Sequence, residues 1–389
     1  MFLIDGPYVS VYLKETLQSL QIPVVKTASA ESYLKDYRIN YLSEAAAVSS
    51  LIHEPQTQLY MNSENALDWL YQKLPESSLV KTAQKVKDKL RFRELLAEIH
   101  PDYFFRGYSR SELSSVNPQH LPYPLILKPS VGFFSLGVHS IENAEQWKRI
   151  LNELDQVINS SENIYPIGVL DNSTFILESV IPGEEFAIDC YYDDSGKVVM
   201  LNMMRHLFAS EADVNDRVYI TSAALIREYR EPIERYLSRL GDCFGLNNFP
   251  AHVELRIDGD NSVMAIEINP LRFGGWCSTA DLAFYAWDMN LYEILDKKSR
   301  PDWDKLVRRS PEKGYALIVL NNSTGTSGGD ITSFNYDALL ETVKTPLELR
   351  KTDFKKFPVF GFLMCSFPVD NLEELYQLLH SDLKEFIVS

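Results

Sequence analysis

The sequence predicts an α/β (α+β) protein, and two observations carry that prediction. Over residues 1–78, strand-like and helix-like segments alternate, which is typical of a small layer with parallel strands. Over residues 251–276, two runs alternate polar and apolar residues on either side of the turn-forming sequence DGDN, which predicts an antiparallel hairpin.

Length and composition are those of an ordinary soluble globular protein. The 389 residues suffice for two or three domains, and 45% of them are hydrophobic and 24% charged. A net charge of -16 at pH 7 argues against general binding to nucleic acid or to an anionic membrane. We therefore expect neither as a partner.

Cysteine usage and the start of the chain predict a cytoplasmic protein. The four cysteines are scattered, without metal-ligand spacing, and we expect reduced thiols. The first residues lack the positive segment of a signal peptide. No apolar run approaches the roughly 18 residues of a transmembrane helix.

The N-terminal segments read as alternating strands and helices, with no GxGxxG motif to indicate a dinucleotide site. We expect strands at 2–4, 22–25 and 58–61 and helices at 11–20, 45–52 and 66–74. A helical stretch at 79–99 follows, rich in lysine, and a solvated basic face is the simplest interpretation of most of these lysines: Lys81, Lys85, Lys87 and Lys89.

A strand at 125–128 ends in Lys128, and we expect Pro129 to end it, because proline cannot extend a central strand. Gly132 and Gly137 flank the following loop and let its peptide N–H groups close on an anion. Lys128 adds a mobile positive charge. The sequence thus predicts a phosphate-binding loop, and an ordinary surface hairpin is the alternative.

The hairpin at 251–276 can bring Glu254 opposite Glu267 and Asn269. Two carboxylates and an amide oxygen that converge on one point suit Mg²⁺, which takes oxygen ligands. The alternative is a half-exposed hairpin whose polar side faces water.

The remaining segments are expected to be regular, with strands at 174–190 (two, around Pro182-Gly183), 197–207, 315–320 and 359–367 and helices at 142–158, 225–240 and 372–386. Arg205, in one of these strands, could meet a phosphate as charge develops in a reaction. The alternative is that Arg205 is a surface residue with no role in a reaction.

The run KPSVGFFSLGV at 128–138, together with Glu254, Glu267, Asn269 and Pro270, resembles the ATP-grasp ligases. The resemblance implies an ATP-grasp fold with an N-terminal α/β preATP-grasp domain (1–80), an ATP-grasp domain (81–300) and a small C-terminal lobe (301–389). It implies ATP and Mg²⁺, with Mn²⁺ as an alternative ion, as cofactors. The metal ligands would be Glu254, Glu267 and Asn269.

The same resemblance assigns the nucleotide contacts. Phosphate would be held by Lys89, at an Asp-Lys helix start, by Lys128 and by the loop residues Ser130, Gly132, Ser135 and Gly137. The adenine would be read by Glu178, Val180 and Ile181, and the ribose hydroxyls by Glu185.

The residues after Asn269 depart from most of the family, which places an arginine where this chain has Leu271. Arg272 followed by FGGW is instead similar to the L-amino acid ligases. There the arginine holds a carboxylate or acyl phosphate, which suits its forked guanidinium, and the tryptophan walls the acceptor pocket. We therefore expect Arg272, Gly275 and Trp276 to contact substrate, with core packing as the alternative for Trp276. The candidate catalytic arginines are Arg272, Arg256 and Arg205.

These resemblances imply an ATP- and magnesium-dependent ligase that joins a small-molecule carboxylate to an amine through an acyl phosphate, with amino acids as the expected substrates. Whether the protein forms a homodimer stays open. Two alternatives remain: another ATP-grasp ligase or carboxylase of small-molecule metabolism, and a non-catalytic nucleotide-binding regulatory module. The absence of a biotin-carrier lysine motif argues against a carboxylase. The joint presence of Lys128, Glu254, Glu267 and Asn269 argues against a regulatory module, which needs fewer such groups.

Overall fold

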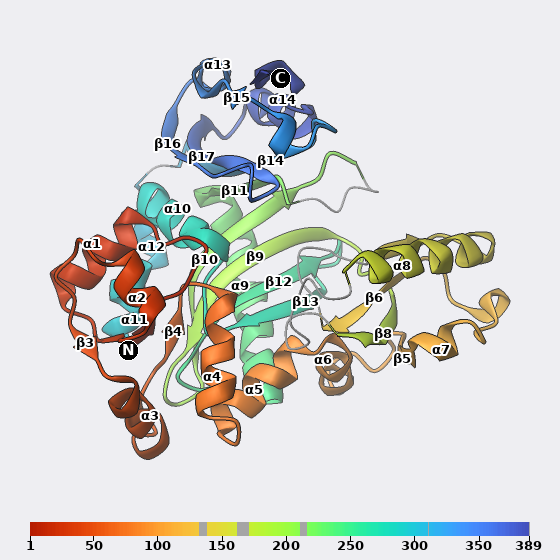
Figure 1. The fold of residues 1–389 in the computed structure, drawn as a ribbon, viewed down its shortest axis with the longest axis horizontal. Coiled ribbons are helices and arrows are strands. Elements are labelled where there is room, and N and C mark those ends of the chain that lie inside the picture. Colours follow the sequence, from red (N-terminus) through yellow and green to blue (C-terminus); the bar gives the residue numbers. More distant parts are fainter. Residues whose placement is uncertain (132–137, 162–170, 211–215, 310, 389) are drawn as a thin grey trace.

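The computed structural model describes residues 1–131, 138–161, 171–210, 216–309 and 311–388. Figure 1 shows an N-terminal layer, a small sheet on the opposite side with its own helices, and a large central sheet that continues into the C-terminal part. Among the helices described, none combines the length and apolar character needed to cross a membrane.

The N-terminal layer is built on four short strands: Phe2–Leu3 (β1), Val24–Val25 (β2), Tyr41–Leu42 (β3) and Tyr60–Met61 (β4). They pair in parallel in the order β3-β2-β1-β4, which confirms the predicted parallel layer. Its helices are Val11–Leu20 (α1), Ala28–Tyr33 (α2), Glu44–His53 (α3) and Leu67–Lys73 (α4). The sequence analysis did not predict β3 or α2.

Two helices replace the single helical stretch expected at 79–99: Ser78–Lys87 (α5) and Lys89–Leu96 (α6). Asp88 separates them with φ -77° and ψ 109°, outside the helical region. Its carboxylate accepts from the backbone N–H groups of Leu90 (3.0 Å) and Arg91 (3.1 Å), which makes it the N-cap of α6. The cap fixes Lys89 at the first position of a helix.

A small antiparallel sheet follows, with strands Phe105–Ser109 (β5), Leu125–Val131 (β6), His139–Ile141 (β7) and Asp171–Ser179 (β8) in the order β5-β8-β6-β7. The helices Arg110–Leu113 (α7) and Trp147–Ser161 (α8) belong to it. Strand and helix side chains form a hydrophobic core distinct from that of the rest of the chain: Leu113, Leu125, Leu127, Ile141, Trp147, Ile150, Leu154, Phe175 and Leu177.

The expectation that Pro129 ends its strand is wrong, because β6 continues to Val131. Pro129 pairs with Phe175 of β8, whereas the pairing of β6 with β7 reaches only Leu127 over the described residues. At Pro129 the strand therefore has one described neighbour, and proline is tolerated where one side of a strand is unpaired.

The central sheet has eight strands: Glu184–Tyr192 (β9), Val198–Leu207 (β10), Val218–Ser222 (β11), Phe249–Ile257 (β12), Val263–Pro270 (β13), Lys313–Asn321 (β14), Pro346–Lys351 (β16) and Val359–Pro368 (β17). They are ordered β13-β12-β9-β10-β11-β14-β17-β16 and pair antiparallel. Because β14 pairs with β11, one sheet crosses the predicted boundary at 300/301. The three domain ranges stay predictions.

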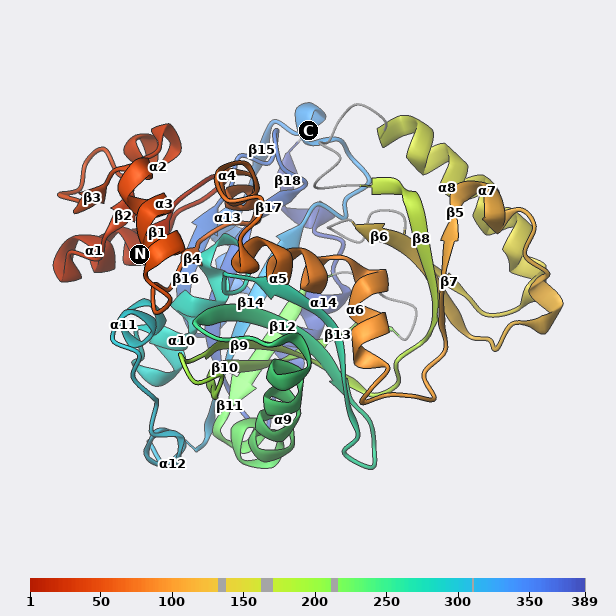
Figure 2. The same ribbon diagram turned by 90° about the horizontal axis from the view of Figure 1, so that it is seen from below.

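Helices Ala223–Phe244 (α9) and Ser278–Trp287 (α10) cover opposite faces of this sheet (Figure 2). Phe186 of β9 packs against Tyr229 of α9, with ring centroids 4.7 Å apart. The next residue, Ala187, packs with Leu282 of α10. Successive residues of a strand point to opposite faces. The α10 side is called the site face below.

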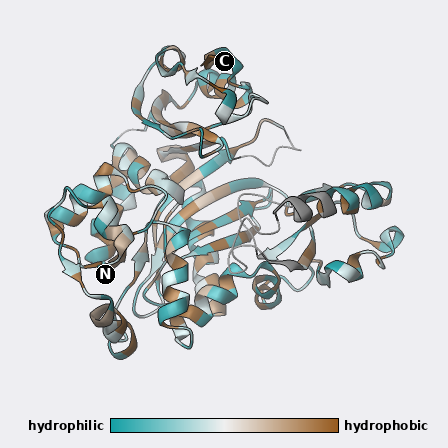
Figure 3. Cartoon of the chain, viewed as in Figure 1, coloured by the Kyte–Doolittle hydropathy of each residue, from teal (hydrophilic) through white to brown (hydrophobic). Residues whose placement is uncertain are grey.

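The rest of the C-terminal part consists of Leu291–Asp296 (α11), Trp303–Leu306 (α12), Ser333–Phe334 (β15), Tyr336–Glu341 (α13), Glu373–His380 (α14) and Ile387–Val388 (β18). The closing helix expected at 372–386 is shorter than predicted, because Ser381 is extended and β18 pairs with β15. Figure 3 shows hydrophilic and hydrophobic bands alternating along the outer helices, as expected for helices with one face on a core.

Candidate active site

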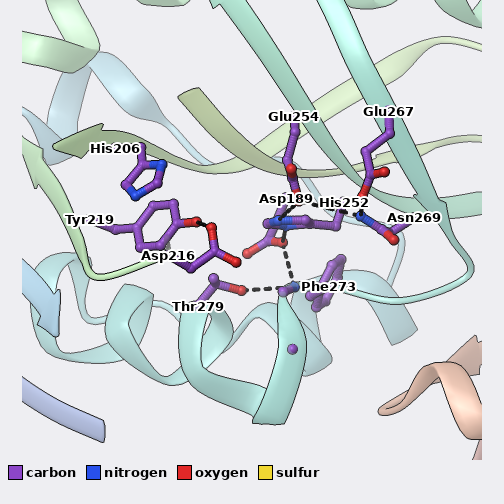
Figure 4. Close-up of polar contacts among 12 residues, drawn as sticks. Asp189, His206, Asp216, Tyr219, His252, Glu254, Glu267, Asn269, Phe273 and Thr279 are labelled. Atoms are coloured by element: carbon purple, nitrogen blue, oxygen red, sulfur yellow. Dashed lines mark hydrogen bonds and ion pairs between the residues drawn. The ribbon is translucent and has the colours of Figure 1, made fainter. Parts of the chain in front are cut away.

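The hairpin of β12 and β13 places the predicted metal ligands on the site face. Glu254 pairs with Glu267, as the alternation predicted, whereas Asn269 pairs with His252. The Asn269 Nδ2 atom lies 3.1 Å from Glu267 Oε1 and 3.5 Å from Glu254 Oε1. All three side chains therefore meet at one point of the hairpin (Figure 4).

The two carboxylates of this pair differ in their tendency to ionise. Burial, followed by the charge of Glu267, raises the pKa of Glu254 well above its ordinary value. Burial acts on Glu267 in the same direction, but nearby lysines outweigh it and lower its pKa. Those lysines are Lys89, whose Nζ lies 3.3 Å from Glu267 Oε2, Lys87 and Lys128. A proton on Glu254 relieves the repulsion between the carboxylates, which a cation could do equally well.

The donor set fits a hard divalent cation. It supplies two carboxylates and one amide, and a half-turn of the Asn269 amide would present its oxygen in place of its nitrogen. In the described part of the chain, no three His, Cys, Asp or Glu side chains are placed to hold a metal. The hairpin would thus offer an incomplete oxygen cage, as expected for Mg²⁺ that fills its other positions with water and phosphate.

Lys128 reaches the same region from β6 of the small sheet. Its Nζ lies 2.6 Å from Glu178 Oε1, and its side chain is 9% exposed. Burial lowers the pKa of Lys128, against the opposing effect of Glu178, and the charge of Lys89 acts with burial. Lys89 and Lys128 are therefore close enough to repel each other, and an anion between them would relieve that repulsion.

Arg93, which the sequence analysis missed, completes this ion network. Its Nε lies 2.5 Å from Glu178 Oε2, and its other nitrogens donate to the carbonyls of Ala265 (2.5 Å) and Ile266 (3.2 Å) in β13. Burial alone would raise the pKa of Glu178, but Arg93 and Lys128 lower it to about 2. Glu178 thus connects the small sheet to the hairpin. Its carboxylate is engaged by two cations in this arrangement, and its contact with adenine stays a prediction.

Ser130, whose contact with phosphate stays a prediction, joins two elements in the structure. Its hydroxyl donates to the Asp88 carboxylate and accepts from the Leu90 N–H at 3.2 Å. Ser130 therefore links β6 to the start of α6, which brings Lys89 toward Lys128. The other predicted loop residues, Gly132, Ser135 and Gly137, lie outside the described residues.

The predicted adenine and ribose positions lie where the chain passes from the small sheet to the central one. The Val180 N–H donates to Pro124 O at 3.3 Å, and Arg256 Nη1 donates to Ile181 O at 2.8 Å. Glu185 accepts from Arg256 Nε and His206 Nδ1, both at 3.1 Å. Arg256 thus holds together the segment that connects the small sheet to the central sheet. In this arrangement its guanidinium binds Glu185 and Ile181 and no reacting group.

Arg205 does not point to the site. Its Nη1 lies 2.9 Å from Glu184 Oε1, and Glu184 also accepts from Tyr229 of α9 at 3.1 Å. The neighbouring His206 turns to the site face, where its ring stacks on Tyr219 at 4.3 Å. Because neighbours in a strand face opposite ways, the predicted catalytic role of Arg205 does not fit the structure.

Arg272 leaves the end of the hairpin and reaches the N-terminal layer. Its Nη2 lies 3.4 Å from Glu64 Oε2, its Nη1 donates to Phe273 O at 2.8 Å, and its Nε is buried without a hydrogen-bond partner in the described part of the chain. Glu64 also forms an ion pair with Lys87. The prediction that Lys87 lies on a solvated face is therefore wrong, because its side chain is only 10% exposed.

Trp276 and Gly275 follow on an irregular segment. Trp276 has a left-handed backbone, with φ 58°. Its ring contacts Tyr8 of the N-terminal layer and Phe357 and Phe362 of the C-terminal part, with centroids 6.0, 5.1 and 5.4 Å away. Gly275 is exposed. Trp276 therefore packs where three parts of the chain meet, so packing and a substrate role both remain compatible with its position.

Comparisons with known proteins relate part of the chain to a domain family. Residues 121–280 match the ATP-grasp domain family. The alanine–anticapsin ligase of Bacillus amyloliquefaciens is 25% identical over 170 residues, which cover 41% of this chain and 35% of that protein. The chain thus matches about a third of the length of this curated relative.

Solved structures with very different activities share the fold. An L-amino acid ligase from Bacillus licheniformis has a TM-score of 0.69 at 17% identity, covering 100% of this chain and 97% of that one. A biotin carboxylase from Campylobacter jejuni, in complex with a nucleotide, has 0.62 at 12% identity, covering 94% and 87%. An N5-carboxyaminoimidazole synthase from Aspergillus clavatus, in complex with ADP, has 0.60 at 14%, covering 99% and 97%. At these identities the likeness concerns the fold.

Proposed function

We propose that this chain, which has the ATP-grasp fold and carries an ATP-grasp domain at residues 121–280, is an ATP-dependent carboxylate–amine ligase acting on amino acids. One observation carries the proposal. Lys128 of the small sheet and Lys89 of α6 flank the hairpin carboxylate Glu267, and the three form a site with phosphate-binding and metal-binding groups side by side.

The lysines would grip the ATP phosphates. Lys128 is held by Glu178, and Lys89 by Glu267, so both cations are positioned before any nucleotide binds. Preorganised charges of this kind stabilise developing charge with little reorganisation. Glu254, Glu267 and Asn269 would hold Mg²⁺, which would neutralise phosphate charge and fix its orientation.

Arg272 would hold the donor carboxylate or the acyl phosphate formed from it. In the structure its partner is another carboxylate, that of Glu64, at 3.4 Å. A substrate carboxylate would exchange with Glu64 at Arg272, and the buried Nε would supply a second donor for a bidentate contact. An amine would then attack the acyl phosphate, giving an amide, ADP and phosphate. The acceptor amine would lie beside Arg272, near Trp276 and Gly275.

A carboxylase or a purine-pathway ligase is the second candidate, because biotin carboxylase and N5-carboxyaminoimidazole synthase share the fold. The assay that separates the candidates is ADP release by the purified protein with ATP and Mg²⁺. Pairs of amino acids should stimulate it above ATP alone, with mass detection of the dipeptide. Stimulation by bicarbonate and none by amino acids would overturn the proposal in favour of the second candidate.

A further inference from the structure

Asp189 of β9 is a buried carboxylate that lies between two parts of the site. It is 1% exposed, and its Oδ1 accepts from His252 Nδ1 at 2.7 Å and from the backbone N–H of Gly274 at 2.9 Å. His252 (Figure 4) belongs to the hairpin of β12 and β13, called the metal hairpin below, and Gly274 belongs to the segment that follows this hairpin. One oxygen atom thus connects two elements.

The first connection reaches a predicted metal ligand. While the Nδ1 of His252 faces Asp189, its Nε2 lies 3.7 Å from Glu254 Oε1. The ring therefore stands between the two carboxylates and limits the directions that the Glu254 side chain can take. Groups that orient a ligand in this way commonly determine metal affinity.

The second connection reaches the substrate loop, defined here as residues 271–277, which contains Arg272 and Trp276. Leu271, Trp276 and Cys277 have φ of 61°, 58° and 57°. Non-glycine residues hold such angles only where their surroundings impose them. A hydrogen bond from Gly274 to a buried acceptor is one such constraint.

Satisfying the backbone does not require Asp189. The Gly274 N–H also donates to Thr279 Oγ1 at 2.9 Å, so it would have a partner without the carboxylate. The second oxygen of Asp189, Oδ2, is buried with no hydrogen-bond partner among the described residues. Burying a carboxylate is costly, and the fold alone does not explain why one lies here.

We propose that Asp189 is a positioning residue that couples the metal hairpin to the substrate loop. Through His252 it orients Glu254, and through Gly274 it holds the loop that carries Arg272. The substrate role of the loop rests on the proposed function. The coupling itself concerns metal binding and loop order, which can be measured without turnover.

The experiment compares Asp189→Ala with Asp189→Asn in the full chain. Mn²⁺ binding in the presence of ADP is measured by the magnetic resonance signal of free Mn²⁺, and loop order by hydrogen exchange of peptides covering 271–277. Asp189→Ala should weaken Mn²⁺ binding about tenfold or more and speed exchange in the loop. Asp189→Asn keeps an acceptor oxygen and should restore most of both. Tyr192→Phe, which removes the buried bond from Tyr192 to Leu237 O (2.9 Å) on the same strand, should change neither.

Two further variants test separately the connection through His252 and the connection through Gly274. They also test the proposal if Asp189→Ala does not fold. His252→Ala should weaken Mn²⁺ binding and leave loop exchange unchanged. Gly274→Ala should speed loop exchange and leave Mn²⁺ binding unchanged, because the new Cβ would lie 2.2 Å from Thr279 Cγ2 and displace the loop.

Several results would overturn the proposal: wild-type values for Asp189→Ala, Asp189→Asn as damaging as Asp189→Ala, or the same pair of changes in His252→Ala and Gly274→Ala. Absence of amino-acid-dependent turnover in the wild type, with the expected Mn²⁺ and exchange results, would remove the proposed function and leave the coupling intact.

Discussion

Arg272 Nη2 and Glu64 Oε2 lie 3.4 Å apart although 208 positions separate them in the chain. This contact joins the end of the metal hairpin to the N-terminal layer, beside Lys87. Burial alone would raise the pKa of Glu64, but Lys87 and Arg272 lower it, so Glu64 stays ionised. The Glu64 carboxylate is thus already paired with Arg272, the residue that we propose binds the substrate carboxylate.

Arg272→Ala should therefore reduce amino-acid-dependent ADP release strongly. Loss of a partly buried partner for a carboxylate costs roughly 3–5 kcal/mol, a factor of about 100 or more in kcat/KM. Glu64→Gln should act oppositely and lower the KM for the donor, because it removes the competing charge. The measurement is steady-state ADP release against donor concentration. A fully active Arg272→Ala variant would contradict this role.

Trp276→Ala should keep ligase activity and broaden the acceptor range, because removing an aromatic wall leaves room for larger side chains. The ring also packs against Tyr8, Phe357 and Phe362, so this variant should unfold at a lower temperature. Trp276→Phe is the control that keeps an aromatic ring. Product yields with Gly, Ala, Leu and Phe as acceptors test the prediction, and an unchanged ranking in Trp276→Ala would leave the residue with a packing role alone.

Lys128→Ala should raise the KM for ATP and lower kcat. A charge-assisted contact contributes about 1.5–3 kcal/mol, which corresponds to roughly a 10- to 100-fold effect. Lys85→Ala is the matched control, because Lys85 is exposed on α5. Lys87 would not serve as a control, since its side chain is only 10% exposed and forms an ion pair with Glu64. Similar losses in the Lys85 and Lys128 variants would indicate general electrostatics and no specific phosphate grip.

Metal binding should release a proton and weaken as the pH falls. The raised pKa of Glu254 favours its protonated form in the metal-free protein, and a bound cation would displace that proton. The affinity for the cation therefore rises with pH, up to the pH at which Glu254 is already ionised in the metal-free protein. Calorimetry of Mn²⁺ binding with ADP, in two buffers of different ionisation enthalpy, measures the released proton. Glu254→Gln should abolish the release, and Glu267→Gln should abolish ADP formation with the fold intact. No proton release in the wild type, or normal turnover in Glu267→Gln, would contradict the assignment.

The hairpin and the N-terminal layer could be predicted because their patterns are local. Alternation over a few residues placed Glu254 opposite Glu267, and the register of β12 and β13 agrees. The helix starting at Lys89 had an equally local signal in Asp88, its N-cap. The features that could be predicted were therefore those that a short stretch of sequence determines.

The contacts that join distant segments could not be predicted in this way. Arg93 meets Glu178 across 85 positions, and His252 meets Asp189 across 63. Arg93 lies beside the buried Phe92, and a charge next to the apolar side of a short helix was the only hint of its role. The two cations that engage Glu178 also come from other elements, so no local pattern indicated them.

Transfer of labelled oxygen tests the central claim most directly. The protein is given ATP, Mg²⁺ and amino acids whose carboxyl groups carry heavy oxygen, and the released phosphate is analysed by mass spectrometry. Attack of the donor carboxylate on ATP, followed by amine attack on the acyl phosphate, predicts one heavy oxygen in the phosphate for each dipeptide formed. Phosphate without heavy oxygen, or its release with no dependence on amino acids, would contradict a carboxylate–amine ligase.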